Sequence, residues 1–201
     1  MDVTIDISRV ILETPRLILR PWKENDLKDF FAYASVPGVG EMAGWKHHQS
    51  IEETKKILDA FIQGKSVFAL EEKQSEKVIG SFGLHFSLLN QEPEYQSLKL
   101  KEIGYVLSKD YWGRGLMPEA VISVISFCFH RQDLDALTVS HYEHNLQSRR
   151  VIEKCGFSFV RQISHHSKQL DKTFESRIYA VSYTHLDVYK RPVSKRRHAS
   201  Y

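Results

Sequence analysis

Hydrophobic and polar positions along the chain follow two different periods. Stretches of alternating or β-branched and aromatic residues, typical of strands, occur at 16–20, 66–72, 78–87, 99–107, 136–141, 157–165 and 173–181. Apolar residues at helical spacing occur between several of them, at 25–35, 50–64, 117–131 and 145–155. This order predicts a single α/β or α+β domain with one mixed, mostly antiparallel sheet of six to seven strands, flanked by about four helices.

Local signals mark the ends of the predicted helices. Asn25 and Asp26 stand where they can cap the first helix, and Ser50 followed by Glu53 has the form of a capping box for the second. Pro118 fits the first turn of the third helix, where a missing N–H costs nothing. Asn145 is a good N-cap for the fourth helix, so its position has a structural explanation on its own.

Composition narrows the class of protein. The 201 residues are 42% hydrophobic and 26% charged, which is typical of a water-soluble globular chain. The longest apolar stretch, 121–129, has nine residues, whereas a membrane span needs about 20. The acidic start lacks the features of a secretory signal, and Cys128 and Cys155 form no CxxC motif. We therefore expect a reduced, cytoplasmic protein that is not bound to a membrane.

The net charge of +3 is concentrated at one end of the chain. Residues 182–201 hold five Lys and Arg residues against Asp187, a net charge of +4, which leaves −1 for residues 1–181. We expect a domain at 1–181 and a basic tail at 182–201 that is disordered or foreign to the domain. A near-neutral domain without a helix-turn-helix, RNA-recognition or zinc-finger motif gives no support for nucleic acid as a partner.

The most informative segment, 102–120, predicts a strand, a glycine-containing loop and the start of a helix. Gly113 and Gly115 allow a positive φ and a close approach of a ligand to the backbone. Unpaired N–H groups and the positive end of the helix dipole suit a phosphate. The Walker motif is absent, and Pro118 stands where a dinucleotide motif would have its third glycine. A tight turn is the alternative interpretation of the two glycines.

Histidines and one carboxylate near the glycine loop invite other interpretations. No HExxH motif or Cys/His ligand spacing appears, so we expect no metal site. Glu119 is explained by the dipole of the helix whose first turn holds it. We expect the histidines that occur in pairs, or that flank a strand end, to lie on the surface: His47, His48, His141, His144, His165 and His166.

Four segments in the same order carry a resemblance to a known family. They are 13–22, 102–107, 111–120 and 145–157. With them the chain resembles the GCN5-related N-acetyltransferases (GNAT) over about residues 11–181. More narrowly, it is similar to the ribosomal-protein N-terminal acetyltransferases of the RimJ/RimL type.

The resemblance implies acetyl-coenzyme A as cofactor and a V-shaped splay between the fourth and fifth strands, 99–107 and 136–141. The pantetheine arm would lie in this gap, and Asn145 and Ser148 would contact the cofactor. Asp110 departs from the family's phosphate-loop pattern, which places more weight on backbone contacts and on the cation of Arg114. The implied backbone and loop contacts are Val106, Leu107, Trp112, Gly113, Arg114, Gly115, Leu116 and Met117.

The family's chemistry implies direct attack of an amine on the thioester. Glu102, in the middle of the cofactor strand, is the candidate general base. Many relatives protonate the leaving thiolate with a tyrosine at the position of Ile152, so Ser148 becomes the candidate acid. Tyr142 and solvent stay open as alternatives, and Cys155 is better explained as core packing.

The acceptor is less defined by the sequence. Trp45 and His48, between the first two helices, are the candidate acceptor-binding residues by family analogy. The acceptor is expected to be a protein N-terminus or a small-molecule amine, and the protein a monomer or homodimer. Two other functions stay open: a protein that binds coenzyme A without turnover, because the tyrosine is missing, and a nucleic-acid-binding module.

Overall fold

The computed structural model describes residues 1–182, and the rest of the predicted tail lies outside the described residues. Within this part, one sheet has eight strands in the order β1-β2-β3-β4-β5-β6-β8-β7. All neighbours are antiparallel except β5 and β6, which makes the sheet mixed, as predicted. The strands are β1 (Leu12–Glu13), β2 (Leu17–Pro21), β3 (Val67–Glu72), β4 (Lys77–His85), β5 (Leu100–Leu107), β6 (Ala136–Tyr142), β7 (Ser158–Ser167) and β8 (Lys172–Ser182).

The strand that exceeds the predicted six or seven is β1. Its two residues pair with Leu19 and Ile18 of β2. Two residues are too few to show an alternating pattern, so this strand exists only through its pairing with β2. At the other end, β8 includes Ser182, one residue beyond the predicted domain boundary.

Within residues 1–182, four α-helices and five short 3-10 turns accompany the sheet. The α-helices are α1 (Leu27–Ala34), α2 (Ile51–Gly64), α3 (Leu116–Arg131) and α4 (Leu146–Lys154). The turns are η1 (Glu24–Asp26), η2 (Glu41–Ala43), η3 (Leu88–Gln91), η4 (Pro93–Tyr95) and η5 (Lys109–Tyr111). No helix in residues 1–182 is both long and apolar enough to cross a membrane.

The start of α2 shows how the sequence sets a helix end. Ser50 accepts a hydrogen bond from the N–H of Glu53 at 3.2 Å, as a capping box requires. The carboxylate of Glu53 instead accepts from the N–H of Gln49 at 2.7 Å, so the reciprocal half of the box is displaced by one residue. At the other end, Gly64 remains inside the helix and Lys65 takes the left-handed cap conformation, with φ of 51°.

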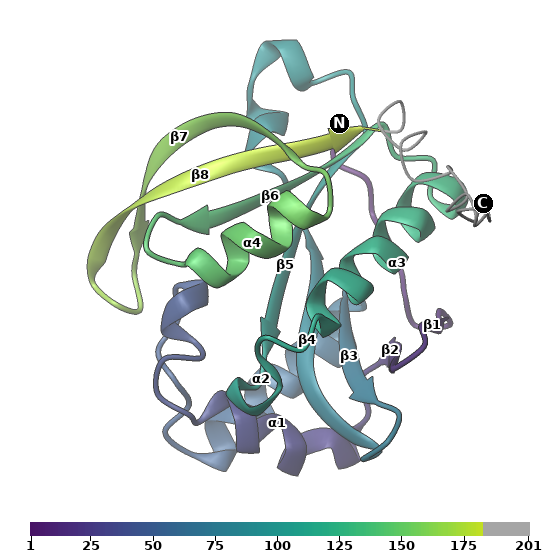
Figure 1. The fold of residues 1–201 in the computed structure, drawn as a ribbon, viewed down its shortest axis with the longest axis vertical. Helices are drawn as coiled ribbons and strands as arrows, with labels where there is room; N and C mark the ends of the chain where they lie inside the picture. The colour runs from purple at the N-terminus through teal and green to yellow at the C-terminus, as the bar shows by residue number, and fades with distance from the viewer. Residues whose placement is uncertain (183–201) are drawn as a thin grey trace, which may run out of the picture.

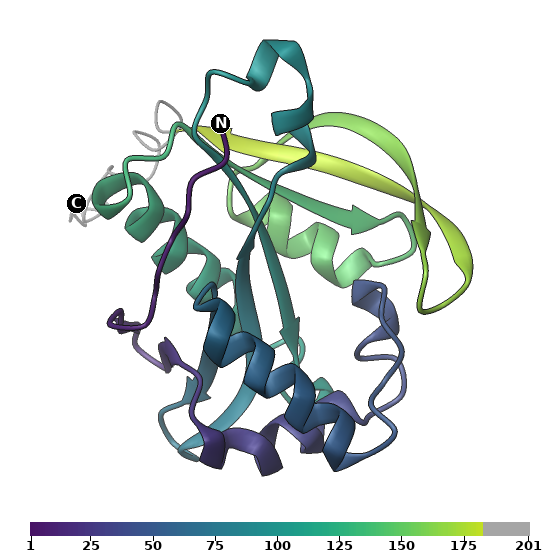
Figure 2. The ribbon, with the colours of Figure 1, turned by 180° about the vertical axis from the view of Figure 1, so that it is seen from behind.

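The helices cover the two faces of the sheet as separate layers. α3 and α4 lie over one face in Figure 1, and α1 and α2 lie over the other in Figure 2. The apolar core on the α3 side includes Phe68 and Phe127, whose rings meet edge to face at 6.2 Å. The core on the α1 and α2 side includes Trp22 and Phe30, with ring centroids 4.8 Å apart.

A buried ion cluster fixes the turn that leads from β2 into α1. The guanidinium of Arg20 donates to both carboxylate oxygens of Asp26 at 2.8 Å and to Glu71 of β3 at 2.6 Å. Arg20 and Asp26 are both buried. Two-pronged pairing of this kind compensates charges that would be costly to bury alone.

The two parallel strands separate halfway along their length. Pairing between β5 and β6 runs from Leu100 with Ala136 to Ile103 with Val139, and stops there. Beyond this point, β5 pairs only with β4, and β6 pairs only with β8. The predicted splay between 99–107 and 136–141 is therefore confirmed, and the second half of β5 has an open edge on the side of β6.

Candidate functional site: a cavity where two strands separate

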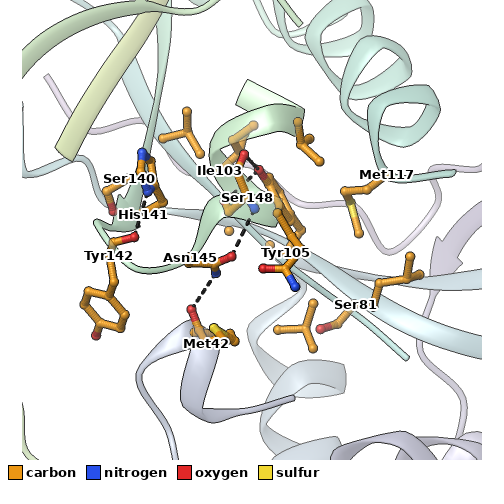
Figure 3. Close-up of a pocket in the computed structure, with 18 of the residues that line it drawn as sticks. Met42, Ser81, Ile103, Tyr105, Met117, Ser140, His141, Tyr142, Asn145 and Ser148 are labelled. Atoms are coloured by element: carbon orange, nitrogen blue, oxygen red, sulfur yellow. Dashed lines mark hydrogen bonds between the residues drawn. The ribbon is translucent and has the colours of Figure 1, made fainter. Parts of the chain in front are cut away.

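A cavity of about 820 Å³ lies where β5 and β6 diverge. Its lining comes from both faces of the sheet. Tyr105, Met117 and Ser148 belong to the side of α3 and α4, whereas Ser81 and Glu102 belong to the side of α1 and α2. Figure 3 labels Ser81, Tyr105, Met117 and Ser148 among the residues around the cavity. The cavity is large enough for a cofactor-sized ligand.

The glycine loop forms one end of the cavity. Gly113 and Gly115 have φ of +76° and +77°, a conformation that other residues adopt only with strain. Gly115 is also the N-cap of α3 and provides no side-chain cap. The N–H groups of the first turn, at Leu116 and Met117, therefore have no acceptor within the helix. This arrangement suits the oxygens of a phosphate.

The cations near this loop differ from the predicted one. Arg114 does not line the cavity; its guanidinium lies over the ring of Tyr111, 4.9 Å from the centroid. Arg150 and Lys154 line the cavity instead, one turn apart on α4. The sequence analysis did not identify them, because α4 is far from the glycine loop in the sequence and comes near it only in the folded protein. Their spacing of four residues after a good N-cap is the signal that could have found them.

The carboxylate of Glu119, in the first turn of α3, has partners that the helix dipole alone did not predict. Its carboxylate accepts from the hydroxyl of Thr14 at 2.5 Å and from the backbone N–H of Arg16 at 2.9 Å, and it pairs with the Arg16 guanidinium at 2.7 Å. Partial burial works to raise its pKa, but these hydrogen bonds outweigh it, so the pKa is lowered. Glu119 thus ties the N-terminal segment to the first turn of α3.

The open edge of β5 forms the wall between the two ends of the cavity. Val106 and Leu107 both line it, as do the loop residues predicted with them except Arg114. The indole N–H of Trp112 donates to the carbonyl of Leu107 at 2.7 Å. Trp112 therefore fixes the glycine loop to the end of the strand.

Asn145 caps α4 and also joins two distant segments. Its side-chain oxygen accepts from the N–H of Ser148 at 3.0 Å, and its amide donates to the carbonyl of Met42 in η2 at 3.0 Å (Figure 3). The capping role is thereby confirmed. The contact of Asn145 with pantetheine stays a prediction, and it would have to be made beside or in place of the bond to Met42.

Ser148 has a hydroxyl partner that the sequence analysis did not single out. The phenol of Tyr105 lies 3.0 Å from the Ser148 hydroxyl (Figure 3). Burial raises the pKa of Tyr105, so its proton is retained at neutral pH. A tyrosine on the inner face of a strand usually packs in the core, so the sequence pattern did not indicate a role in the site. The alternation of the strand does place Tyr105 on the face opposite Glu102.

The other two candidates for the acid lie less favourably. The buried Cys155 thiol faces the carbonyl of Pro118 at 3.8 Å, and burial raises the pKa of this thiol to about 12. It belongs to the core, as expected. In Figure 3 the ring of Tyr142 points away from Ser148. That ring stacks on Phe174, with centroids 4.4 Å apart.

Glu102 stands in the wall of the cavity that faces α1 and α2. Its carboxylate accepts from the hydroxyl of Ser140 on β6 at 2.7 Å and from the backbone N–H of Leu88. Burial raises the pKa of Glu102 above its ordinary value, although the two hydrogen bonds offset part of this effect. A carboxylate with a raised pKa is a better proton acceptor near neutral pH.

His85 is the cross-strand partner of Glu102 and was not predicted as a site residue. Its ring lies along Gly83 and Gly104, where any larger side chain would meet it. Loss of hydration, with a smaller effect from the charge of Lys101, lowers the pKa of His85. The glycines at 83 and 104 are the sequence signal for a ring that lies flat on the sheet.

The two residues predicted to bind the acceptor occupy different positions. Trp45 lines the cavity, but His48 does not. The His48 ring is buried against Phe30 and Trp45, and its Nδ1 lies 2.8 Å from the hydroxyl of Thr54. His48 is thus buried away from the cavity, and this position gives no support to the predicted contact with the acceptor.

The expectation that the histidines lie on the surface is wrong for His141 as well as for His48. His141 is buried, like His48, and its Nδ1 lies 2.8 Å from the carbonyl of Tyr142. Both rings fill space inside the domain and have polar partners there. No group of three or more His, Cys, Asp or Glu residues suited to a metal ion occurs in the part of the chain that the structure describes.

Comparison with known proteins identifies the class to which this fold and site belong. The model of the acetyltransferase (GNAT) domain matches residues 16–158. The chain therefore belongs to the GNAT family of N-acetyltransferases, whose members use acetyl-coenzyme A.

Individual relatives agree with this assignment. The uncharacterized N-acetyltransferase YoaA of Bacillus subtilis is 25% identical over 176 residues, which cover 85% of this chain and 96% of YoaA. The structure of a GNAT-family acetyltransferase from Bacillus anthracis superimposes with a TM-score of 0.74 at 19% identity, covering 86% of this chain and 98% of that one. The spermidine N-acetyltransferase of Vibrio cholerae, solved with CoA and spermine, gives 0.68 at 15% identity, covering 84% and 96%.

These similarities identify the family and the enzyme class but not the branch or the acceptor. Solved ribosomal-protein acetyltransferases share the fold, but at the same low identity they show the fold alone. The assignment to the RimJ/RimL branch stays a prediction. The enzyme class is established by the family, whereas the acceptor amine is not.

Proposed function

We propose that the protein transfers the acetyl group of acetyl-coenzyme A to a primary amine by direct attack in a ternary complex. The acceptor is a protein N-terminus or a small-molecule amine. One observation carries this proposal: a single cavity, opened by the splay of β5 and β6, holds a carboxylate on one side and a pair of hydroxyls on the other. Amine acetylation needs a proton acceptor and a proton donor in these relative places.

The residues of the cavity fit acetyl-coenzyme A. Val106 and Leu107, on the stretch of β5 that β6 leaves unpaired, line the part of the cavity where an amide-containing arm would lie, and the N–H groups at residues 113–117 suit its pyrophosphate. Arg150 and Lys154 add positive charge on the facing helix. When bound, acetyl-coenzyme A supplies an activated acetyl thioester.

The chain's own groups then move the protons. Glu102 accepts the proton of the attacking amine, directly or through a water molecule. On the opposite side of the cavity, Ser148 donates a proton to the leaving thiolate and takes the phenol proton of Tyr105, and Tyr105 regains a proton from solvent as Glu102 releases the one that it accepted. The hydroxyl pair thus takes the role that Ile152, a buried aliphatic residue, is unable to take.

The base assignment is tested with Glu102→Gln and Ser140→Ala. We expect Glu102→Gln to lower kcat/KM for any accepted amine by about 10²- to 10⁴-fold, the usual contribution of a general base. Ser140→Ala keeps the carboxylate but removes a hydrogen bond that lowers its pKa. Activity is lost as pH falls through the pKa of Glu102, so this acid limb should move to higher pH in Ser140→Ala. A Glu102→Gln enzyme of unchanged rate at pH 8 would exclude Glu102 as the base.

A second function has one observation in its favour. The missing tyrosine at Ile152 is consistent with a protein that binds coenzyme A without turnover. Release of free thiol from acetyl-coenzyme A, measured with a panel of amines, distinguishes the two. Tight binding of coenzyme A without amine-dependent thiol release would favour the binding protein.

We also propose a setting for the enzyme. It acts in the cytoplasm, as a monomer or homodimer, and its branch is that of the RimJ/RimL enzymes. The two buried free cysteines support a reducing compartment. The four segments that carry the resemblance, 13–22, 102–107, 111–120 and 145–157, support the branch. A retention assay on nucleic acid at rising salt tests the remaining alternative, for which the near-neutral charge of residues 1–181 offers little support.

A further inference from the structure

We infer that the acceptor carries a single ammonium group on an apolar body, and that polyamines are poor acceptors. This inference deepens the proposed acetyltransferase function and rests on it. It follows from the charge and the polarity of the cavity on the side of Glu102.

The cavity is poor in negative charge. Among the described residues that line it, Glu102 is the only carboxylate. Two neighbouring carboxylates are engaged elsewhere: Glu41 lies 2.7 Å from the Nδ1 of His47, and Glu92 pairs with Arg161. One amine can therefore be neutralised at Glu102, but the further ammonium groups of a polyamine would find no partner. An unpaired cation is costly to remove from water.

The existing cations add to this discrimination. Arg150 and Lys154 line the cavity on the side of α4. In the proposed complex these two side chains face the phosphates of the cofactor, so this side of the cavity provides no carboxylate for a second ammonium group. A cation without a partner is costly to remove from water, so the cavity disfavours an acceptor with several charges.

The walls on the acceptor side are apolar. Met42 and Trp45 come from the segment around η2, Phe61 comes from α2, and Phe86 and Leu88 follow β4. Phe86 and Leu88 are large apolar side chains that remain 45% and 36% exposed. A ligand that covers them gains about 25 cal/mol for each Å² of apolar surface removed from water. The site is therefore complementary to an apolar group next to the amine.

Two sources share this chemistry: a small aralkylamine and a peptide that begins with a bulky apolar residue. The test measures initial rates of thiol release with the full-length protein at saturating acetyl-coenzyme A. The acceptors are 2-phenylethylamine, a tripeptide amide beginning with Phe, a matched tripeptide amide beginning with Asp, and spermidine. The ratio of kcat/KM for the Phe peptide to kcat/KM for 2-phenylethylamine distinguishes the two sources.

We expect kcat/KM for the better of the two apolar acceptors to exceed that for spermidine and for the Asp peptide by at least tenfold. A higher kcat/KM for spermidine would overturn the inference and leave the acetyltransferase proposal intact. If the protein binds coenzyme A but no amine releases thiol, the proposed function fails and the inference fails with it.

A carboxylate placed at Phe86, on the edge of the cavity, provides a second test that needs only two of the acceptor amines. Phe86→Glu adds a carboxylate beside the acceptor side of the cavity, and Phe86→Gln is the matched neutral control. Because Phe86 is largely exposed, both variants should fold. We expect the ratio of kcat/KM for spermidine to that for 2-phenylethylamine to rise at least tenfold more in Phe86→Glu than in Phe86→Gln. Equal ratios in the two variants would overturn the inference.

Discussion

At the scale of single residues, a hydroxyl from a strand meets a hydroxyl from a helix in the cavity. Ile152, on α4, is buried and faces the core. Tyr105, on β5, approaches the same helix from the sheet and places its phenol 3.0 Å from Ser148. A tyrosine supplied by the strand can therefore serve the chemistry that many relatives perform with a tyrosine of the helix.

This arrangement predicts the effects of removing each hydroxyl. Tyr105→Phe and Ser148→Ala should each lower kcat by about 10²-fold, and the double variant should lose little more than the worse single one, because the two act as one donor. Tyr95→Phe, on η4 and outside the cavity, is the matched control. Fully additive losses would mean that the two hydroxyls act independently.

At the scale of elements, two glycines on β4 have different roles. A Cβ at Gly80 would run into the backbone carbonyl of Val106 on β5, which has nowhere to move. A Cβ at Gly83 would meet only the ring of His85, a side chain that can turn away. The close approach of β4 and β5 therefore depends on Gly80, whereas Gly83 makes room for an imidazole.

Alanine substitutions should separate these roles. Gly80→Ala should lower the free energy of unfolding by about 1–3 kcal/mol, the usual cost of overpacking. Gly83→Ala should cost clearly less and instead alter the pH dependence of activity, because it displaces His85 from beside Glu102. Urea unfolding and a pH profile of kcat/KM measure the two effects. Equal losses of stability would contradict the difference in contacts.

The segment around η2 gives a prediction about pH. Burial tends to raise the pKa of Glu41, but hydrogen bonds from His47 and from the backbone N–H of Gly38 outweigh it and lower the pKa to about 2. A lowered pKa stabilises the folded state above the ordinary value of 4.5, and this stabilisation disappears as pH falls toward about 2.

Tryptophan fluorescence can report this change through Trp45, whose backbone N–H donates to the carbonyl of Gly40 in the same segment. The wild-type signal should change between pH 4.5 and about 2, whereas Glu41→Gln should lack this transition. A transition that persists in Glu41→Gln would assign it to another carboxylate.

At the scale of the whole molecule, periodicity anticipated most of the fold. Strands such as 136–141 and the helix at 117–131 were predictable because each is long enough to show its period and buries one face or stripe. β1 is too short for this. The burial of His48 and the positions of Arg150 and Lys154 depend on contacts between segments far apart in the chain, which local patterns do not contain. For the same reason, the sequence analysis did not assign Tyr105 and His85 to the site.

Global stability should depend strongly on the buried ion cluster of Arg20. Arg20→Met leaves Asp26 buried without its partner, which should cost about 3–5 kcal/mol in the free energy of unfolding. The double variant Arg20→Met/Asp26→Leu should recover much of this loss. Lys55→Met, which breaks the exposed pair with Asp59, should have no measurable effect. If Arg20→Met unfolded like the Lys55 control, the cluster would contribute nothing.

The early end of pairing between β5 and β6 also has a kinetic consequence. Because the gap joins two faces of the sheet, the two substrates of the proposed reaction reach it from opposite layers and occupy different parts of it. We expect free coenzyme A to inhibit competitively against acetyl-coenzyme A but not against the amine. If β5 had paired with β6 along its whole length, no gap would join the two faces, and substrates bound on opposite faces could not meet.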